Sequence, residues 1–567
     1  MIIYRPQSRV EALRPFLAEL CDRAAAVADL DAAASLLIDC GDLESALTDT
    51  ICPREDDDSP LARLLGAATL LAARAFVLMA RGTPRRSPRD LRSLQLTLDR
   101  LQRHDLPADV RIPVPEGYAY YALYPETYAE SARCLAREHR PERVFVLGIR
   151  SIGSSLGAVV AAALELEGCR VSSITVRPRG HPFDRRLAVT PFLAGRLRAA
   201  AADHWFAVVD EGPGLSGSSF ASVSSLLARL GVPDRRIVLF PSWIPDGSRF
   251  VSASARTRWQ RHAKYWTPFE RVCAPHPDLL DISGGRWRPL FVREGDQQPP
   301  VQPQHERRKY YGRRGGLQLW KFAGLGRYGL PSRTVAERLA DAGFAPPVLG
   351  LHRGFLSMAF VYGHPLTSAQ ITEDLLAIMA RYVAFRRRAL VANCSIPFDE
   401  NFEMIRVNLN EGLGGAPAHA MALLERCRGL LTAEPAVAID GRMLPHEWIA
   451  TVDRYRKTDG ADHHRDDFFP GCQDAAWDLA GACAEFGLSP GARAYLLGQY
   501  RRASGDDAAP RLPYYLIAYL AFRLGYVTVA AASAPESAEA ARFQLQQVRY
   551  RSLLERELIQ ICEVTRP

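Results

Sequence analysis

The sequence predicts a multidomain protein that combines α/β and α+β structure. Its 567 residues exceed what one hydrophobic core holds, so about three domains are expected. Up to residue 110 the apolar residues recur at helical spacing, whereas residues 111–293 alternate short apolar runs with helical segments. A polar, Pro-rich stretch at 294–304 then separates a third region, 305–567. We therefore expect a helical N-terminal module, a parallel α/β sheet, a linker and an α+β C-terminal domain.

The composition is that of an ordinary soluble globular protein, with 48% apolar and 24% charged residues. The net charge of +8 is modest for this length, and much of it is arginine. It favours phosphorylated small-molecule ligands but does not by itself indicate nucleic acid. No apolar run approaches about 18 residues, so we expect no membrane-spanning helix. Eleven cysteines without a CxxC pair indicate a reducing, cytoplasmic environment.

The N-terminal region has the helical pattern at residues 10–29, 61–79 and 88–104. The second of these segments is apolar and Ala-rich, but it contains Arg74, which favours a buried helix over a membrane segment. This region carries no cluster of residues suited to catalysis. We expect it to pack on the next domain, where it would help to shape a pocket.

Residues 205–220, WFAVVDEGPGLSGSSF, give the clearest indication of function. An apolar run ends in Asp210 and Glu211, and a stretch rich in Gly and Ser then opens a helix over 221–230. Such a turn offers free backbone N–H groups and the positive end of a helix dipole, which together bind anions. Paired carboxylates just before the turn suit vicinal hydroxyls or a metal ion. A sugar that carries a phosphate is the simplest ligand that fits both features.

The same residues resemble the 5-phosphoribosyl-1-diphosphate loop of type I phosphoribosyltransferases, with a spacer one residue longer than the common form. In that family two acids hold the ribose 2- and 3-hydroxyls, and a Thr-Gly-x-Thr segment wraps the 5-phosphate. The resemblance implies that Asp210 and Glu211 are the catalytic acids. It also implies that the 5-phosphate binds to Ser216, Gly217, Ser218 and Ser219.

Two further strand–turn segments resemble other parts of that family's pocket. An apolar run at 143–149 leads into a Gly/Ser turn that resembles the diphosphate loop. A third strand, 171–176, leads into a basic segment that resembles the family's hood over the diphosphate. Arginine suits such a place because its planar fork pairs bidentately with phosphate oxygens. The resemblance thus assigns the diphosphate to Arg150, Ser151, Gly153, Arg177 and Arg179.

The third region begins with the pattern of a strand at 315–322, with Lys321 between apolar neighbours, and of a helix at 332–342 that contains Glu337. Two paired strands follow within 347–361 and end at a Gly-containing hinge. This order of elements resembles the small lobe of a kinase, most closely that of the aminoglycoside and choline phosphotransferases. The resemblance implies that Lys321 holds nucleotide phosphates and that Glu337 orients it by an ion pair. A purely structural salt bridge is the alternative for this pair.

The expected large lobe of this bilobal, kinase-like domain fits the resemblance in part. Residues 474–480, DAAWDLA, look like the Asp-Pro-x-x-Asp-Leu-Ala segment that follows the metal site in those phosphotransferases. Upstream, 454–458 has the pattern of a strand that delivers a metal-binding Asp459. The catalytic-loop pattern His-x-Asp followed by Asn is absent, and residues 446–448 (His-Glu-Trp) stand in its place, with Glu447 as the candidate substitute.

Acids and histidines crowd the segment just after Asp459. Such a cluster suits Mg²⁺ or Mn²⁺ through its carboxylates, and a solvated acidic loop or an acid–base network is the alternative. The residues concerned are Asp462, His463, His464, Asp466 and Asp467. The domain is therefore an active small-molecule kinase, a nucleotide-binding pseudokinase, or a domain that has lost nucleotide binding.

Three functional hypotheses follow from these patterns. The first is a transferase-type, phosphoribosyltransferase-like protein that binds a phosphoribosyl diphosphate or a nucleotide together with Mg²⁺, with the acceptor unassigned. The second is an ATP-dependent small-molecule kinase in the C-terminal domain, with the first domain as a sensor. The third is a non-catalytic nucleotide-binding module. All three share a phosphorylated small molecule as the ligand, and protein partners are not indicated.

Overall fold

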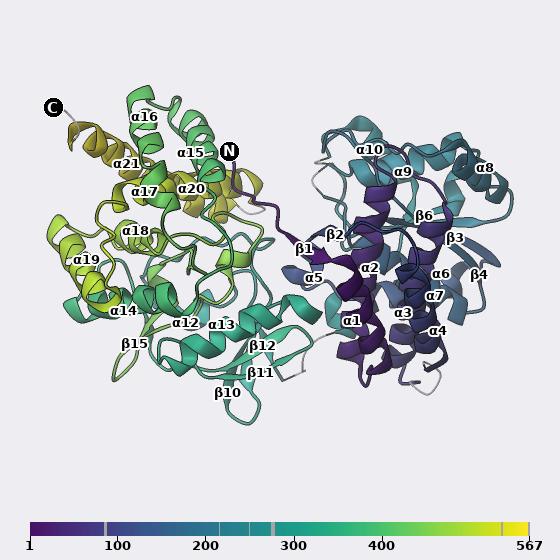
Figure 1. The fold of residues 1–567 in the computed structure, drawn as a ribbon, viewed down its shortest axis with the longest axis horizontal. Helices are drawn as coiled ribbons and strands as arrows, with labels where there is room; N and C mark the ends of the chain where they lie inside the picture. The colour runs from purple at the N-terminus through teal and green to yellow at the C-terminus, as the bar shows by residue number, and fades with distance from the viewer. Residues whose placement is uncertain (84–87, 215, 249, 274–277, 535–536, 565–567) are drawn as a thin grey trace. The chain divides into compact units, whose positions relative to one another are not determined.

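The computed structural model describes residues 1–567 apart from 84–87, 215, 249, 274–277, 535–536 and 565–567. The chain divides into two compact units (Figure 1). The N-terminal unit comprises Ser8–Pro277 and Gly324–Tyr328, and the C-terminal unit comprises Met1–Gln7, Asp278–Ala323 and Gly329–Pro567. The boundary expected near residue 110 thus lies inside the N-terminal unit.

A parallel sheet forms the centre of the N-terminal unit. Its strands are β3 (Arg143–Ile149), β4 (Arg170–Val176), β5 (Trp205–Val209), β6 (Ile237–Phe240) and β7 (Ala263–Lys264). Their order is β4-β3-β5-β6-β7, and every neighbouring pair is parallel. The three central strands are short, apolar and almost wholly buried, as is typical of parallel sheets. The expected alternation of strands and helices around a parallel sheet is therefore present.

The three helical segments expected before residue 110 correspond to α1 (Leu13–Ala25), α3 (Pro60–Ala80) and α4 (Pro88–Gln102), all in the same unit. A further helix, α2 (Leu30–Ile51), lies between α1 and α3. Side-chain caps fix two of their starts, because Asp29 accepts a hydrogen bond from Ala32 N and Ser59 accepts one from Ala62 N. Helices α2 and α3 pack on each other and on α7 (Gly153–Leu166), the helix that follows β3 (Figure 1).

The other elements of the N-terminal unit connect or flank this core. A two-stranded antiparallel ladder, β1 (Ser8–Ala12) with β2 (Asp109–Pro113), joins the start of the unit to the segment after α4. The remaining helices are α5 (Glu116–Ala119), α6 (Pro125–His139), α8 (Pro191–Ala200), α9 (Ser218–Arg229), α10 (Ala253–Arg261) and α11 (Phe269–Val272), with the 3₁₀ turns η2 (Asp234–Arg236) and η3 (Gly326–Tyr328).

An antiparallel sheet forms the smaller part of the C-terminal unit. Its strands are β8 (Leu280–Asp281), β9 (Lys309–Arg313), β10 (Leu317–Phe322), β11 (Val348–His352) and β12 (Phe355–Ala359), in the order β11-β12-β10-β9-β8. Helix α13 (Leu330–Asp341) follows β10 and contacts β11. The register places Lys321 of β10 opposite Lys309 of β9. Two lysines therefore stand side by side on this sheet.

The larger part of the C-terminal unit is mostly helical. It contains α14 (Glu373–Ala389), α15 (Phe398–Leu413), α16 (Ala418–Arg426), α17 (Arg428–Thr432), α18 (Ala476–Glu485), α19 (Pro490–Ser504), α20 (Leu512–Ser533) and α21 (Ser537–Val564). A small sheet, β13 (His364–Pro365), β14 (Trp448–Ala450) and β15 (Tyr455–Lys457), lies among the loops, together with the short turns α12 (Arg288–Phe291), η4 (Pro445–Glu447) and η5 (His463–Arg465). One large apolar core holds these elements together, with Trp448 and Trp477 fully buried in it. The mixed α/β and α+β class expected from the sequence is thus confirmed.

Two helices are long and apolar enough to cross a membrane, by length and composition alone. They are α3 and α20, and half and two thirds, respectively, of their apolar windows are buried inside the protein. Burial of this kind is also what the core helix of a globular protein shows.

Candidate functional site

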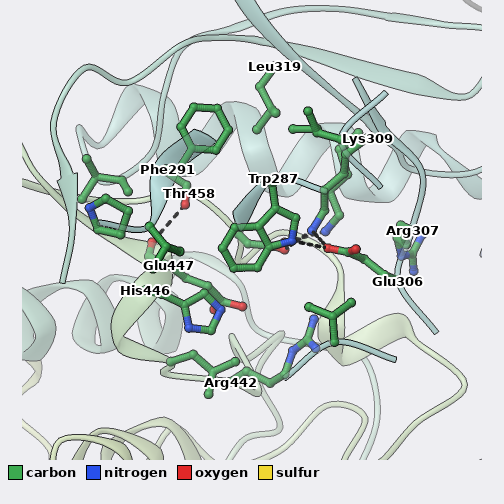
Figure 2. Close-up of a pocket in the computed structure, with 18 of the residues that line it drawn as sticks. Trp287, Phe291, Glu306, Arg307, Lys309, Leu319, Arg442, His446, Glu447 and Thr458 are labelled. Carbon is green, nitrogen blue, oxygen red and sulfur yellow. Dashed lines mark hydrogen bonds and ion pairs between the residues drawn. The ribbon is translucent and has the colours of Figure 1, made fainter. Parts of the chain in front are cut away.

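A cavity of about 560 Å³ lies within the C-terminal unit. Figure 2 shows the indole N–H of Trp287 directed at Glu306, with the ammonium group of Lys309 on the same carboxylate. One part of the lining is apolar and consists of Leu290, Phe291, Leu319, Pro346, Phe360 and Val361. Another part is charged or ionisable and includes Lys309, Lys321, Arg442, Glu447, Asp459 and His463. The cavity therefore suits a ligand with an apolar, planar portion and an anionic portion.

Lys321 stands at the charged side of the cavity and is buried. Its ammonium group lies 2.5 Å from Oδ1 of Asp459 and 2.8 Å from Oδ1 of Asp462. Burial alone would raise the pKa of Asp459, but the charge of Lys321 beside it holds that pKa well below its usual range. The carboxylate of Asp459 is consequently ionised at neutral pH and available to a cation.

The predicted ion pair between Lys321 and Glu337 is wrong. Glu337 lies on the surface of α13, where its Oε1 accepts a hydrogen bond of 2.7 Å from Arg333 four residues earlier. An i,i+4 pair on one helix needs no tertiary contact. Asp459 and Asp462 pair with the lysine in place of Glu337, because both approach it from the loop after β15.

Three potential metal ligands meet beside Lys321. One ligand atom from each of Glu447, Asp459 and His463 lies within 4.8 Å of the others. The Nδ1 atom of His463 lies 2.9 Å from the carbonyl oxygen of Asp440, which fixes the tautomer with the proton on Nδ1. Its Nε2 then carries a lone pair, and Arg442 donates to that atom in this structure. Two carboxylates and an oriented imidazole fit a divalent cation.

The structure explains how the segment 446–448 differs from a kinase catalytic loop. Trp448 is fully buried in the core, so its side chain does not line the cavity. Glu447 faces the cavity, and its Oε2 accepts a hydrogen bond of 2.7 Å from Lys457. His446 stacks on Trp287 with ring centroids 5.6 Å apart, and burial lowers its pKa to about 4. The imidazole of His446 is therefore neutral at physiological pH.

The acids of the segment 474–480 help to hold the loop at 440–447 in position. The carboxylate of Asp478 accepts hydrogen bonds from the backbone N–H groups of Asp440 and Gly441, at 2.8 and 2.9 Å. Asp474 is held by Arg511 at 2.5 Å. Of the cluster after Asp459, Asp462 and Asp466 pair with Arg307, and His464 is buried, which lowers its pKa to about 3. This cluster is an ordered network rather than a solvated loop.

Sequence reasoning missed several residues of this cavity. Lys309 and Arg442 add positive charge, and Trp287 supplies a flat aromatic surface. Lys309 has a sequence signal, since it begins a strand that pairs with the Lys321 strand. Arg442 and Trp287 have none, because they lie in irregular segments far from Lys321 in the chain.

The loop between β5 and α9 in the N-terminal unit carries the other predicted site. Asp210 and Glu211 directly follow β5, and Gly217 caps α9 with a φ of 61°, a conformation that favours glycine. The hydroxyls of Ser216 and Ser218 both donate to the carbonyl oxygen of Pro182, at 2.9 and 2.7 Å. The Ser219 hydroxyl accepts a hydrogen bond of 3.4 Å from Arg185, so the loop already has partners within the protein.

The arginines assigned to the diphosphate are paired with acids of the helical region. Arg150 is fully buried between Asp49, at 2.8 Å, and Asp56. Arg177 contacts Asp49, and Arg179 lies 3.1 Å from Asp56. Two carboxylates, from α2 and the loop after it, therefore contact all three guanidinium groups and offset two of their three charges.

The two remaining residues of the predicted diphosphate loop are tightly fitted. The backbone N–H of Ser151 donates to the Ser45 hydroxyl at 3.1 Å, and Ser151 has a φ of 109°. At Gly153 an added Cβ would lie 2.7 Å from the carbonyl oxygen of Val209, so only glycine fits there. Close packing of α7 on β5 accounts for the glycine at position 153.

Asp210 supports a pH-dependent prediction. Burial raises the pKa of its carboxyl from 3.8 to about 6, so the folded protein holds this proton more tightly than the unfolded chain. Ionised Asp210 therefore opposes folding above about pH 6, and the effect vanishes below about pH 4. Asp210→Asn should raise the melting temperature above that of the wild type near pH 7.5 but not near pH 4. Melting curves over this range test it, with exposed Asp184→Asn as the control, and an equal shift at both pH values would contradict it.

The chain was compared with known proteins. No protein-family model matches it, and no curated protein matches it significantly. Among solved structures, a choline/ethanolamine kinase family protein from Mesorhizobium loti is 20% identical over 44% of this chain and 88% of its own, with a TM-score of 0.31. Choline kinase LicA from Streptococcus pneumoniae is 14% identical over 47% of this chain and 96% of its own, with a TM-score of 0.33. An aminoglycoside phosphotransferase from Alicyclobacillus acidocaldarius is 15% identical over 45% and 90%, with a TM-score of 0.32. Sequence identities and TM-scores this low assign neither an activity nor a substrate to this chain.

Proposed function

We propose that the C-terminal unit binds a nucleoside triphosphate with a divalent metal ion and transfers its terminal phosphoryl group to a small molecule. The observation that carries this proposal is one cavity lined by Lys321, by the ligand set Glu447, Asp459 and His463, and by an apolar wall. A strand lysine and a metal-binding aspartate are two of the parts that protein kinases use for phosphoryl transfer.

Each group of residues has a distinct part in this function. Lys321, Lys309 and Arg442 attract and orient the phosphates through their positive charge. Glu447, Asp459 and His463 hold the metal ion, which would neutralise charge on the phosphate oxygens when bound. Phe291 and Phe360 line the apolar side, where they offer aromatic surface to a nucleobase. Catalysis then rests on positioning and charge stabilisation.

Turnover can be tested directly. Purified protein is incubated with ATP, Mg²⁺ or Mn²⁺ and a panel of hydroxyl-bearing small molecules, and ADP formation is followed. We expect acceptor-stimulated ADP formation in the wild type and none in Lys321→Met. The proposal of catalysis fails if ATP binds with metal but no acceptor stimulates its turnover, which would leave a nucleotide-binding module.

The histidine in the ligand set predicts the preferred metal. Mg²⁺ favours oxygen ligands, whereas an imidazole nitrogen favours first-row transition ions such as Mn²⁺ or Co²⁺. We expect His463→Ala to weaken Mn²⁺ affinity at least about tenfold and Mg²⁺ affinity much less. Titrations of the protein with each ion measure this, and His446→Ala, which alters the cavity outside the ligand set, is the matched control. Equal losses for the two ions would contradict a histidine ligand.

A second candidate function belongs to the N-terminal unit. We propose a phosphoribosyl-type ligand at the β5–α9 loop, favoured by two acids at the end of a central parallel strand and a glycine turn that opens α9. The diphosphate would reach Arg150, Arg177 and Arg179 only by displacing the carboxylates that hold them. We also propose a cytoplasmic location, which the eleven free cysteines favour.

The test of the second candidate separates the two units. In the combined Asp210→Asn and Glu211→Gln variant, stabilisation by 5-phosphoribosyl-1-diphosphate with Mg²⁺ should disappear while stabilisation by ATP remains. Thermal melts with each ligand measure both effects. Unchanged stabilisation by the ribosyl diphosphate in the double variant would remove this candidate.

A further inference from the structure

A second cavity, of about 270 Å³, lies in the N-terminal unit between α2, α3, α7 and the sheet strand β4. None of the residues predicted to bind phosphate lines it. Small residues leave the space open, since α3 presents Ala62, Gly66 and Ala67 to it and α7 presents Gly157 and Ala158. Ala67 is exposed, so the cavity opens to solvent at α3. A small molecule can therefore reach its interior.

Two hydroxyl groups in the cavity wall have no hydrogen-bond partner among the described residues. They are Oγ1 of Thr48 and Oγ of Ser154, and the two residues are only 2% and 1% exposed. A buried hydroxyl is nearly always hydrogen-bonded, because an unsatisfied one costs about 1–3 kcal/mol. These two hydroxyls can therefore form hydrogen bonds with a polar molecule in the cavity.

The charge of the wall indicates what kind of molecule this is. Glu44 is 4% exposed, and its Oε1 accepts a hydrogen bond of 3.1 Å from Thr175. No basic side chain among the described residues forms an ion pair with it.

The cationic groups near Glu44 are already committed to other acids. Arg63 and Arg196 at the cavity rim both pair with Asp58. Arg150 pairs with Asp49 and Asp56. Asp57, a further acid of the lining, accepts a hydrogen bond of 2.6 Å from the Thr190 hydroxyl rather than an ion pair. Glu44 is thus a buried carboxyl group of the wall that no ion pair among the described residues engages.

We propose that this cavity binds a small molecule that carries an ammonium or guanidinium group. The cation lies against Glu44, and hydrogen-bonding groups elsewhere on the ligand reach Thr48 and Ser154. A buried carboxylate pairs with such a group through a charge-assisted hydrogen bond, which offsets the cost of removing water from both charges. This ligand site is independent of the phosphoryl chemistry proposed for the C-terminal unit.

The site also has an expected pH response. Burial raises the pKa of Glu44 to about 7, and hydrogen bonds from Thr69 and Thr175 and the charge of Arg150 lower it only in part. A cationic ligand selects the ionised carboxylate, so its affinity increases as the pH rises through about 7.

The experiment compares cationic and neutral probes of the same shape. Saturation-transfer NMR on the full chain is recorded with ethanolamine, putrescine and agmatine, and with ethylene glycol and 1,4-butanediol as neutral counterparts. We expect at least one amine to bind the wild type and the diols not to bind. Glu44→Gln, which keeps the hydrogen bond from Thr175, should weaken the affinity for that amine at least about tenfold.

A second variant guards against a folding defect in the first. Ala67→Phe fills the exposed mouth of the cavity without changing the buried charge, and it should also abolish amine binding. Melting curves establish that each variant is folded. The proposal is overturned if no amine binds the wild type, if diols bind as well as amines, or if amine binding survives in both variants.

Discussion

Asp459→Asn should weaken binding of the metal–ATP complex by at least about 100-fold, the larger of the two binding effects expected in the C-terminal unit. In the proposed site Asp459 would contribute an ionised carboxylate to the metal, and its Oδ1 lies 2.5 Å from the ammonium group of Lys321. Asparagine keeps the shape but loses the charge that both contacts need. The fold should survive, since Lys321 retains Asp462 and Lys309 retains Glu306. Isothermal titration with ATP in the presence of Mn²⁺ measures the loss.

The matched control for this variant is Asp453→Asn. Asp453 lies six residues earlier, is largely exposed and pairs with its neighbour Arg454 outside the cavity. Asp453→Asn makes the same chemical change outside the proposed site, so the affinity of this variant for metal–ATP should equal that of the wild type. If Asp459→Asn behaved like this control, the assignment of Asp459 as a metal ligand would be wrong.

Arg511→Met should cost about 3–5 kcal/mol of stability, the largest effect expected on the fold. Arg511 is 3% exposed and lies 2.5 Å from Asp474, 2.6 Å from Asp506 and 3.3 Å from Glu434. Its removal leaves the fully buried carboxylate of Asp474 without a counter-charge. Asp474 adjoins the start of α18, which carries Asp478 and thereby orders the loop at 440–447.

Chemical unfolding monitored by tryptophan fluorescence tests this prediction, since Trp477 lies in the same core. Arg501→Met is the control, because Arg501 is exposed and lies 3.6 Å from Asp507, and it should change stability by less than about 0.5 kcal/mol. Adding Asp474→Asn to Arg511→Met should recover part of the loss by removing the stranded charge. A loss no larger than that of the control would show that the Asp474 carboxylate is adequately solvated.

Local patterns in the sequence were sufficient for several elements of the fold. The apolar run at 205–209 becomes β5, and the Gly/Ser turn after it opens α9, because both depend on residues close together in the chain. Lys321 was identified for a similar reason, since a lysine between apolar neighbours on a strand is buried. Asp459 was identified because it directly follows a short predicted strand.

The partners of these residues could not be predicted in the same way. Glu337 was expected to reach Lys321, but Arg333 on the same helix lies closer and takes its carboxylate. Asp49 and Asp56, about 100 residues before Arg150, have no pattern that marks them as its partners. The ion pairs that Lys321 and Arg150 do form arise from tertiary packing, which residue spacing does not encode.

The central claim is that one cavity in the C-terminal unit binds metal and nucleotide together, and thermal stabilisation by ATP tests it most directly. Melts are recorded with ATP alone, with Mn²⁺ or Mg²⁺ alone, and with ATP plus each ion, on the wild type and on Asp459→Asn. At about 100 times its dissociation constant a ligand adds about 2.7 kcal/mol of stability, which is readily detected. The account predicts a shift with ATP plus metal that is much larger than with either alone and that is lost in Asp459→Asn. A shift that needs no metal, or that survives in the variant, would contradict it.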